Sequence, residues 1–154
     1  MKSLTLLAFA GLFAGFGSLA TAQDDPFADA VETRHGLMLQ MSADLGKMGA
    51  MAKGDAPFDA AIAAKAAANL AAIASVLSME QFPEGSENGK AADSYAKPDI
   101  WANQPDFLAK IADLNTAAAA LQPMTADLES LKTGMGGVGK ACGACHKAYR
   151  MAEN

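Results

Sequence analysis

The sequence predicts an all-α protein, an up-and-down four-helix bundle, and three observations support this fold class. Apolar residues recur at intervals of three and four in four separate segments, as on one face of a helix. Prolines and glycines separate these segments. No segment alternates apolar and polar residues as a half-buried strand would. Four amphipathic helices of this kind bury their apolar faces most simply by packing around one core.

The first two helices are predicted on either side of a short connection. Pro26 opens the first, which runs to about Lys53-Gly54. Its inner stripe consists of Val31, Arg34, Met38, Met41, Leu45 and Met48. Pro57 opens the second, and the apolar residues on one of its sides are Phe58, Ile62, Ala66, Leu70, Ile73 and Leu77.

The other two helices follow a long loop over residues 78–97, which contains Pro83, Gly85 and Gly89. Pro98 and Pro105 flank a short turn that carries Trp101. The third helix then shows the stripe Phe107, Ile111, Leu114, Ala118 and Leu121. Pro123 separates it from the fourth, whose inner stripe is Leu128, Leu131, Met135, Val138, Cys142, Cys145 and Tyr149.

Residues 1–22 have the pattern of a secretory signal peptide, which leaves residues 23–154 as one domain. Lys2 precedes an apolar run from Leu4 to Leu19, and Ala20-Thr21-Ala22 is a typical cleavage site. A single membrane anchor is the alternative, but the run is short and rich in glycine. The formal net charge is −5, and removal of Lys2 makes it more negative. This charge argues against nucleic-acid binding and favours a partner with a positive patch.

The most specific motif lies near the C-terminus, where Cys142-Gly143-Ala144-Cys145-His146 has the C-x-x-C-H pattern. This pattern is typical of covalent c-type haem attachment, in which two thiols join the haem and the histidine supplies an axial nitrogen. The chain has two cysteines, so the motif uses both. Because both thiols fall on the inner stripe of the fourth helix, we expect one haem c, covalently bound, in the core of the bundle.

Three other interpretations of the motif fit less well. A zinc site would need Cys142, Cys145, His146 and His35, and the adjacent Cys145 and His146 are awkward ligands for one tetrahedral ion. A thioredoxin-like pair should follow a strand, whereas this motif lies in a helical pattern. A structural disulfide beside a chance histidine is the third.

The second axial ligand of the iron must come from upstream of the motif. If the first and fourth helices are antiparallel neighbours, Met38 lies at the level of the haem, whereas Met48 lies about 15 Å away at 1.5 Å per residue. A thioether is a soft ligand that suits haem iron, so Met38 and His146 are the predicted ligand pair. Core packing of Met38, ligation by Met41 one turn away, and ligation by His35, off the inner stripe, are the alternatives.

Two arginines are candidates for contacts with the haem. Arg34 lies on the apolar stripe, where a buried guanidinium needs a partner, and a haem propionate would serve. Alternatively, its stem packs inward while its head reaches water. Arg150 follows His146 by four residues, so it either borders the imidazole or is a solvated charge at the helix end.

Four glycines, at positions 134, 136, 137 and 139, interrupt the predicted fourth helix. Each costs roughly 0.5–1 kcal/mol relative to alanine in a helix. We expect either that they leave room beside the flat haem ring or that the helix is broken there.

Several local motifs resemble those of the cytochrome c-prime family, including its low-spin, methionine-ligated relatives. They are Ala52-Lys53-Gly54 with Pro57-Phe58-Asp59, Pro98-Asp99-Ile100-Trp101, and Val138-Gly139 leading to Cys142–His146 and Tyr149-Arg150. The resemblance covers nearly all of residues 23–154. It implies a periplasmic four-helix bundle, often a homodimer, with haem on Cys142 and Cys145 and His146 as proximal ligand.

The resemblance implies two functions, which differ at the position that Met38 occupies. The low-spin relatives have a ligating methionine there, so Met38 favours a one-electron carrier that docks transiently with redox partner proteins. Cytochromes c-prime proper are five-coordinate and bind nitric oxide or carbon monoxide, and Arg34 resembles the arginine of that branch. A peroxidase would need distal acid–base groups, and the sequence offers at most Arg34 and His35 near the site. We therefore expect no enzymatic activity.

Overall fold

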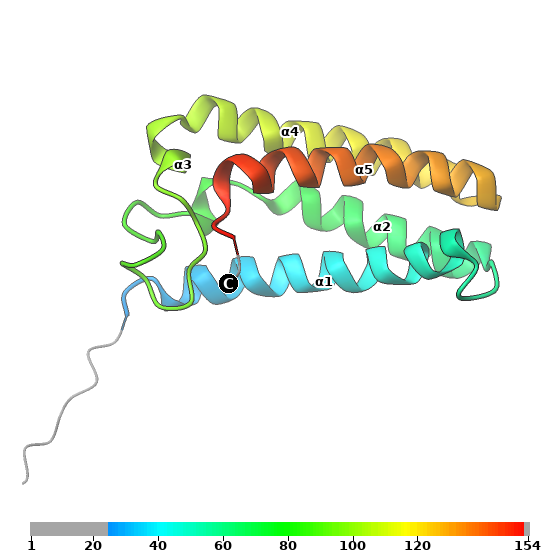
Figure 1. The fold of residues 1–154 in the computed structure, drawn as a ribbon, viewed down its shortest axis with the longest axis horizontal. Coiled ribbons are helices and arrows are strands. Elements are labelled where there is room, and N and C mark those ends of the chain that lie inside the picture. Colours follow the sequence, from blue (N-terminus) through cyan, green and yellow to red (C-terminus); the bar gives the residue numbers. More distant parts are fainter. Residues whose placement is uncertain (1–24, 153–154) are drawn as a thin grey trace, which may run out of the picture.

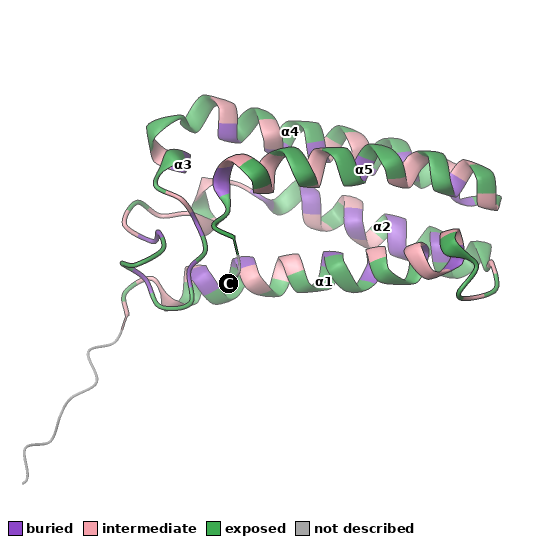
Figure 2. Ribbon diagram, in the orientation of Figure 1, coloured by how far each residue is buried: buried purple, intermediate pink, exposed green. Residues whose placement is uncertain are grey.

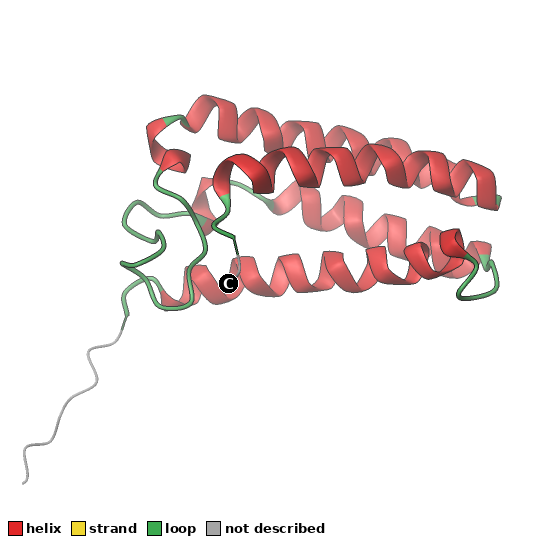
Figure 3. Cartoon of the chain, viewed as in Figure 1, coloured by secondary structure: helices red, strands yellow, loops and turns green. Residues whose placement is uncertain are grey.

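The computed structural model describes residues 25–152, so the predicted signal peptide, residues 1–22, lies outside the described part of the chain. Four long helices form the bundle, α1 (Ala28–Lys53), α2 (Ala60–Val76), α4 (Gln104–Leu121) and α5 (Leu128–Tyr149) (Figure 1). The short elements are η1 (Met79–Gln81), α3 (Asp99–Ala102) and η2 (Gln122–Thr125). No strand occurs in residues 25–152 (Figure 3). The predicted all-α four-helix bundle is confirmed.

The helix ends follow the predicted breaks closely. α1 ends at Gly54, whose φ of 82° is one that glycine adopts without strain. The carboxylate of Asp59 accepts hydrogen bonds from the backbone N–H groups of Ala61 and Ile62 and so caps α2. Asp127 caps α5 in the same way through the N–H of Ser130. α1 and α2 begin two and three residues later than Pro26 and Pro57, the positions that the sequence suggested.

The core lies between the four long helices, and the buried positions of each helix face it (Figure 2). α1 packs against α2 and α5 and runs antiparallel to α5, as expected. The expected face of α2 is partly wrong, because Ile62 is 48% exposed. That helix instead buries small side chains together with one leucine, namely Ala63, Ala66, Ala67, Leu70 and Ala74.

The long loop between α2 and α3 folds over one end of the bundle, where α5 finishes (Figure 1). The indole Nε1 of Trp101 donates to the carbonyl oxygen of Phe82 at 3.0 Å. The N–H of Lys97 donates to the carbonyl of Tyr149 at 2.9 Å. The N–H of Met151 donates to the carbonyl of Tyr95 at 2.8 Å. The loop is therefore attached to the end of α5.

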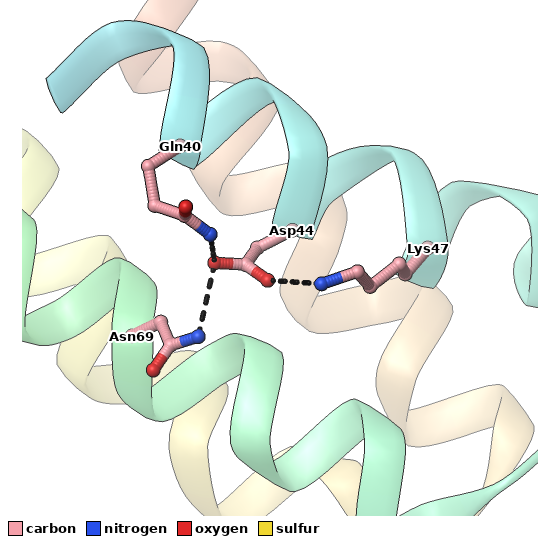
Figure 4. A network of polar contacts seen from close by, with 4 residues as sticks. All are labelled: Gln40, Asp44, Lys47 and Asn69. Atoms are coloured by element: carbon pink, nitrogen blue, oxygen red, sulfur yellow. Dashed lines mark hydrogen bonds and ion pairs between the residues drawn. The ribbon is translucent and has the colours of Figure 1, made fainter. Parts of the chain in front are cut away.

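A buried carboxylate joins α1 to α2 (Figure 4). Asp44 has no exposed surface, and its Oδ2 accepts hydrogen bonds from Gln40 Nε2 at 2.8 Å and Asn69 Nδ2 at 3.2 Å. Its Oδ1 lies 3.0 Å from the Nζ of Lys47. Burial alone raises the pKa of Asp44, but these hydrogen bonds outweigh it, so the pKa is lowered overall.

No helix within residues 25–152 is long and apolar enough to cross a membrane.

Candidate haem site

A cavity of about 630 Å³ lies inside the bundle, at the end that the long loop covers. Its wall combines residues of α1, α4, α5 and the loop, and most of them are apolar. All five predicted site residues line it, namely Arg34, Met38, Cys142, Cys145 and His146. The structure therefore brings together side chains that are more than 100 positions apart in the sequence.

The α5 wall carries the C-x-x-C-H motif. Cys142 and Cys145 are three residues apart on one continuous helix, so both thiols lie on the same helix face, and both are half-buried and free. Burial raises the pKa of the Cys142 thiol. Burial, reinforced by the neighbouring Cys142, raises the pKa of Cys145 to about 11. Both groups are therefore protonated at neutral pH in this apolar environment.

The alternative interpretations of the motif find no support in this arrangement. In residues 25–152, no three His, Cys, Asp or Glu side chains form a group that could hold a metal ion, so the four zinc candidates are not assembled. The motif lies within the last three turns of α5, with helix rather than strand before it. The two cysteines form no disulfide.

The α1 wall carries two methionines that line the cavity. Met41 is 4% exposed and belongs to the buried core. Met38 is half-buried and packs against that core from the edge. Its side chain thus belongs more to the cavity and less to the core than that of Met41.

His35 also lines the cavity, as its alternative role as an iron ligand requires. It is half-buried, and its ring centroid lies 6.5 Å from that of Tyr95. A signal was available, because His35 precedes Met38 by three residues and shares its side of the helix. The sequence pattern placed His35 off the inner stripe, whereas it borders the cavity, and ligation of the iron by His35 stays an alternative.

Arg34 is buried, with 4% of its surface exposed, and it binds the long loop. Its Nη1 donates to Ser86 Oγ at 2.9 Å and to the carbonyl of Gln81 at 3.2 Å. Its Nη2 donates to the carbonyl of Ser86 at 2.8 Å and to Ser94 Oγ at 2.6 Å. The guanidinium carbon also lies 5.2 Å from the centre of the Phe82 ring. Burial lowers the pKa of Arg34.

These contacts bear on the predicted environment of the Arg34 guanidinium, which was either a haem propionate or water. The alternative in which its head reaches water is wrong, because the loop encloses the guanidinium. A propionate contact stays a prediction, and both terminal nitrogens already have partners in the loop. Ser86 and Ser94 had no signal in the sequence, because contacts with an irregular loop leave no periodic pattern.

A polar group lies on the α4 side of the cavity, next to the motif. The hydroxyl of Tyr149 donates to Asp106 Oδ2 at 2.6 Å, and Lys110 Nζ lies 3.0 Å from Asp106 Oδ1. Burial and the hydrogen bond to Asp106 raise the pKa of Tyr149 to about 12. Lys110 and Tyr149 line the cavity, and neither Lys110 nor Asp106 was among the predicted site residues.

The glycines of α5 do not have the predicted role. The helix is continuous from Leu128 to Tyr149, so it is not broken. None of glycines 134, 136, 137 and 139 lines the cavity. Gly134 instead packs against η2 and the end of α4, since an added Cβ would lie 2.7 Å from Leu121 Cδ1. The other three face open space.

Residues 29–150 match the sequence model of the family described as Cytochrome C'. The chain belongs to the cytochrome c' family. It is 50% identical over 124 residues to cytochrome c-554 of Cereibacter sphaeroides, a match that covers 80% of this chain and 93% of that protein. Among solved structures, cytochrome c prime from Shewanella frigidimarina superposes with a TM-score of 0.74 at 35% identity, covering 82% and 97% of the two chains.

A second solved structure, a nitric oxide complex of a cytochrome c prime variant from Alcaligenes xylosoxidans, superposes with a TM-score of 0.71 at 31% identity. The superposition covers 82% of this chain and 97% of the Alcaligenes xylosoxidans chain. These matches confirm the resemblance to the cytochrome c-prime family.

Membership of the cytochrome c' family makes this chain a haem c cytochrome, and the cavity fits that cofactor. Its volume is within the range of roughly 300–1,000 Å³ for cofactor sites, and its wall is largely apolar. The two thiols and the imidazole of the attachment motif border the same space.

Proposed function

We propose that this cytochrome is a one-electron carrier with low-spin haem, in which Met38 and His146 ligate the iron. The observation that carries the proposal is the position of Met38 on α1, on the wall of the same cavity that His146 borders from α5. When bound, haem c supplies an iron centre that accepts and releases one electron. With both axial positions filled by the protein, no site is left open for a substrate.

The residues of the chain have three roles in this proposal. Cys142 and Cys145 would attach the cofactor to α5, and His146 from α5 and Met38 from α1 would hold its iron. The apolar side chains of the wall, such as Ile111 and Leu114, exclude water, which limits the reorganisation that accompanies electron transfer. Arg34 holds the long loop against the cavity, and a propionate contact for Arg34 remains our prediction.

The ligand pair is tested by spectroscopy of the purified holoprotein. A ferric protein with Met38 as ligand has a near-infrared charge-transfer band from sulfur to iron, and Met38→Ala abolishes it. Met41→Leu is the matched control, because it removes the other cavity methionine with little change in volume. A high-spin ferric spectrum that Met38→Ala leaves unchanged would overturn the proposal. Loss of the band in Met41→Leu alone would transfer the ligand role to Met41.

A second candidate function is the binding of nitric oxide or carbon monoxide at a five-coordinate iron. It is supported by the nitric oxide complex of the relative from Alcaligenes xylosoxidans and by the presence of Arg34. In that case carbon monoxide binds the ferrous protein without displacing a protein ligand. In the carrier, Met38 must leave first, so binding is slower in the native protein than in Met38→Ala.

We further propose that the protein acts in the periplasm, because residues 1–22 have the features of a cleavable export signal. A homodimer is also proposed, on the basis of the family resemblance and of exposed apolar side chains on α1 and α2, including Leu39 and Val76.

A further inference from the structure

An ion pair on α4 lies at the wall of the haem cavity. Lys110 Nζ lies 3.0 Å from Oδ1 of Asp106, which precedes it by about one helical turn. Among residues 25–152, Lys110 is the one lysine that lines the cavity, and no aspartate or glutamate lines it. The pair is therefore oriented, with its cation toward the cavity and its carboxylate farther away.

A hydrogen bond from a second helix holds this pair in place. The hydroxyl of Tyr149 on α5 donates to Asp106 Oδ2 at 2.6 Å, so each oxygen of the carboxylate has a partner of its own. Tyr149 is buried, and 25% of the Lys110 side chain is exposed. A lysine on an open helix surface samples many rotamers. The ammonium of Lys110 is instead bound to a carboxylate that is itself fixed.

Both members of the pair are charged at neutral pH. The hydrogen bond from Tyr149, together with that from Lys110, lowers the pKa of Asp106. The hydrogen bond to Asp106 raises the pKa of Lys110. Two more acids, Asp99 and Asp113, lie within electrostatic reach of Tyr149 and Lys110 respectively, but neither of them lines the cavity.

The charge of Lys110 acts on the part of the cavity that carries the attachment motif. Burial raises the pKa of the Cys145 thiol to about 11, and the Lys110 ammonium opposes that rise. The field of Lys110 therefore reaches a residue that would bind the haem. Because most of the cavity wall is apolar, a charge there is screened less than a charge on open surface.

Stabilisation of the helices explains only part of this arrangement. Asp106 lies in the first turn of α4, where a carboxylate is favourable, and its bond to Tyr149 joins α4 to the end of α5. Neither role requires a cation at the cavity wall. Glutamine at position 110 would suit the helix about as well as lysine does.

We infer that Lys110, fixed by Asp106 and Tyr149, raises the reduction potential of the haem iron. Reduction adds one electron to the iron centre, so a nearby cation stabilises the ferrous form and a nearby carboxylate stabilises the ferric form. Because Lys110 borders the cavity and Asp106 does not, the cation has the larger effect. The inference rests on the proposed electron-carrier function and adds a residue that adjusts its driving force.

The inference is tested by spectroelectrochemical titration of the holoprotein. At an ionic strength of about 0.1 M, exposed charges more than about 10 Å apart are largely screened. We expect Lys110→Gln to lower the midpoint potential, so that the equilibrium constant for reduction falls roughly threefold to tenfold. Lys110→Arg keeps the charge, so its midpoint potential should stay close to that of the native protein.

The matched control is Lys132→Gln, which changes the net charge by the same amount. Lys132 pairs with Glu129 at 2.8 Å on α5, and the ten residues between it and Cys142 correspond to about 15 Å of helix. Lys132 does not line the cavity, so we expect no change in the midpoint potential. Equal shifts in Lys132→Gln and Lys110→Gln, or no shift in Lys110→Gln, would overturn the inference.

Tyr149→Phe separates the effect of charge from that of packing. The substitution removes the hydrogen bond to Asp106 and keeps the aromatic ring and both charges of the pair. We expect the free energy of unfolding to fall, while the midpoint potential changes less than in Lys110→Gln. A larger change of potential in Tyr149→Phe would contradict the role of Lys110.

Failure of this inference can be told apart from failure of the proposed carrier function. The near-infrared band reports whether Met38 ligates the iron, whatever the charge at position 110. The order of the midpoint potentials among the Lys110 variants is expected with either set of axial ligands, because the variants that are compared share the same ligands.

Discussion

Two buried charges on α1, ten residues apart, have different surroundings and different consequences. Arg34 lines the haem cavity and donates to neutral acceptors of the long loop, 47 to 60 residues away. Asp44 does not line the cavity, and its partners are Lys47 and Gln40 on its own helix and Asn69 on α2. Arg34 therefore positions the loop that forms part of the cavity wall, whereas Asp44 joins α1 to α2 away from the cavity.

The free-energy cost of burying a charged side chain therefore does not by itself show whether the residue serves the cavity or the packing of the helices. Both groups are almost wholly enclosed, and both have hydrogen-bond partners, as burial requires. What differs is the element that the partners belong to. A charge bonded to an irregular loop beside a cavity helps to fix the geometry of that cavity, because the bonds of Arg34 tie the loop to α1, as those of Lys97 and Met151 tie it to α5.

The largest expected effect comes from Arg34→Ala. The substitution removes four hydrogen bonds to buried acceptors of the loop, so we expect the free energy of unfolding to fall by about 3–4 kcal/mol, although the Ser86 carbonyl and Ser94 Oγ each keep another partner. We also expect faster carbon monoxide binding, because Phe82 and Tyr95 of the loop are no longer held at the cavity. Chemical denaturation and flash photolysis measure the two quantities.

The matched control for Arg34→Ala is Asp44→Ala. It is expected to lower the free energy of unfolding by about 2–3 kcal/mol while leaving carbon monoxide binding unchanged. If both variants change the rate of carbon monoxide binding by the same factor, the proposed difference between Arg34 and Asp44 is wrong.

The next effect is a pH dependence that belongs to Asp44 and not to Arg34. Its pKa is lower in the folded state than the ordinary 3.8, because hydrogen bonds outweigh the effect of burial. Such a group contributes stability that is fully present above its unfolded pKa and is lost as pH falls through its folded pKa. The difference in unfolding free energy between the native protein and Asp44→Asn should therefore be constant near neutral pH and shrink below pH of about 4. Urea denaturation at a series of pH values measures it, and a difference that grows on acidification would contradict the assignment.

The same contrast explains which parts of the structure could be predicted from the sequence. The helix ends were predictable because Gly54, Asp59 and Asp127 act on their own neighbours. The attachment motif was recognisable because its three reactive groups lie within five residues. The bond between Arg34 and Ser94 spans 60 residues and joins a helix to an irregular loop, so no spacing rule applies to it.

The wrong prediction of the buried face of α2, which included Ile62, has a related cause. A helix whose apolar residues are mostly alanines has apolar groups on several sides, so its pattern does not define one inner face. The structure buries Ala63 and Ala67, and leaves Ile62 largely in solvent. Close approach of helices favours small residues at the contact, and alanines lie beside Leu70 on the buried face of α2.

The smallest expected effect tests the contrast between packed and exposed positions on α5. Gly134→Ala places a methyl group 2.7 Å from Leu121 Cδ1, and Leu121 is fully buried, so the crowding outweighs the gain in helix propensity. We expect the free energy of unfolding to fall by about 1 kcal/mol. Gly137→Ala adds the same methyl group in open space, and we expect a rise of about 0.5–1 kcal/mol. Thermal unfolding of the two holoproteins measures these changes in free energy. Changes of opposite sign would follow from packing alone, because both glycines are helical and differ only in what an added Cβ meets. Equal changes in the two variants would mean that helix propensity governs both positions and that Leu121 moves aside at little cost.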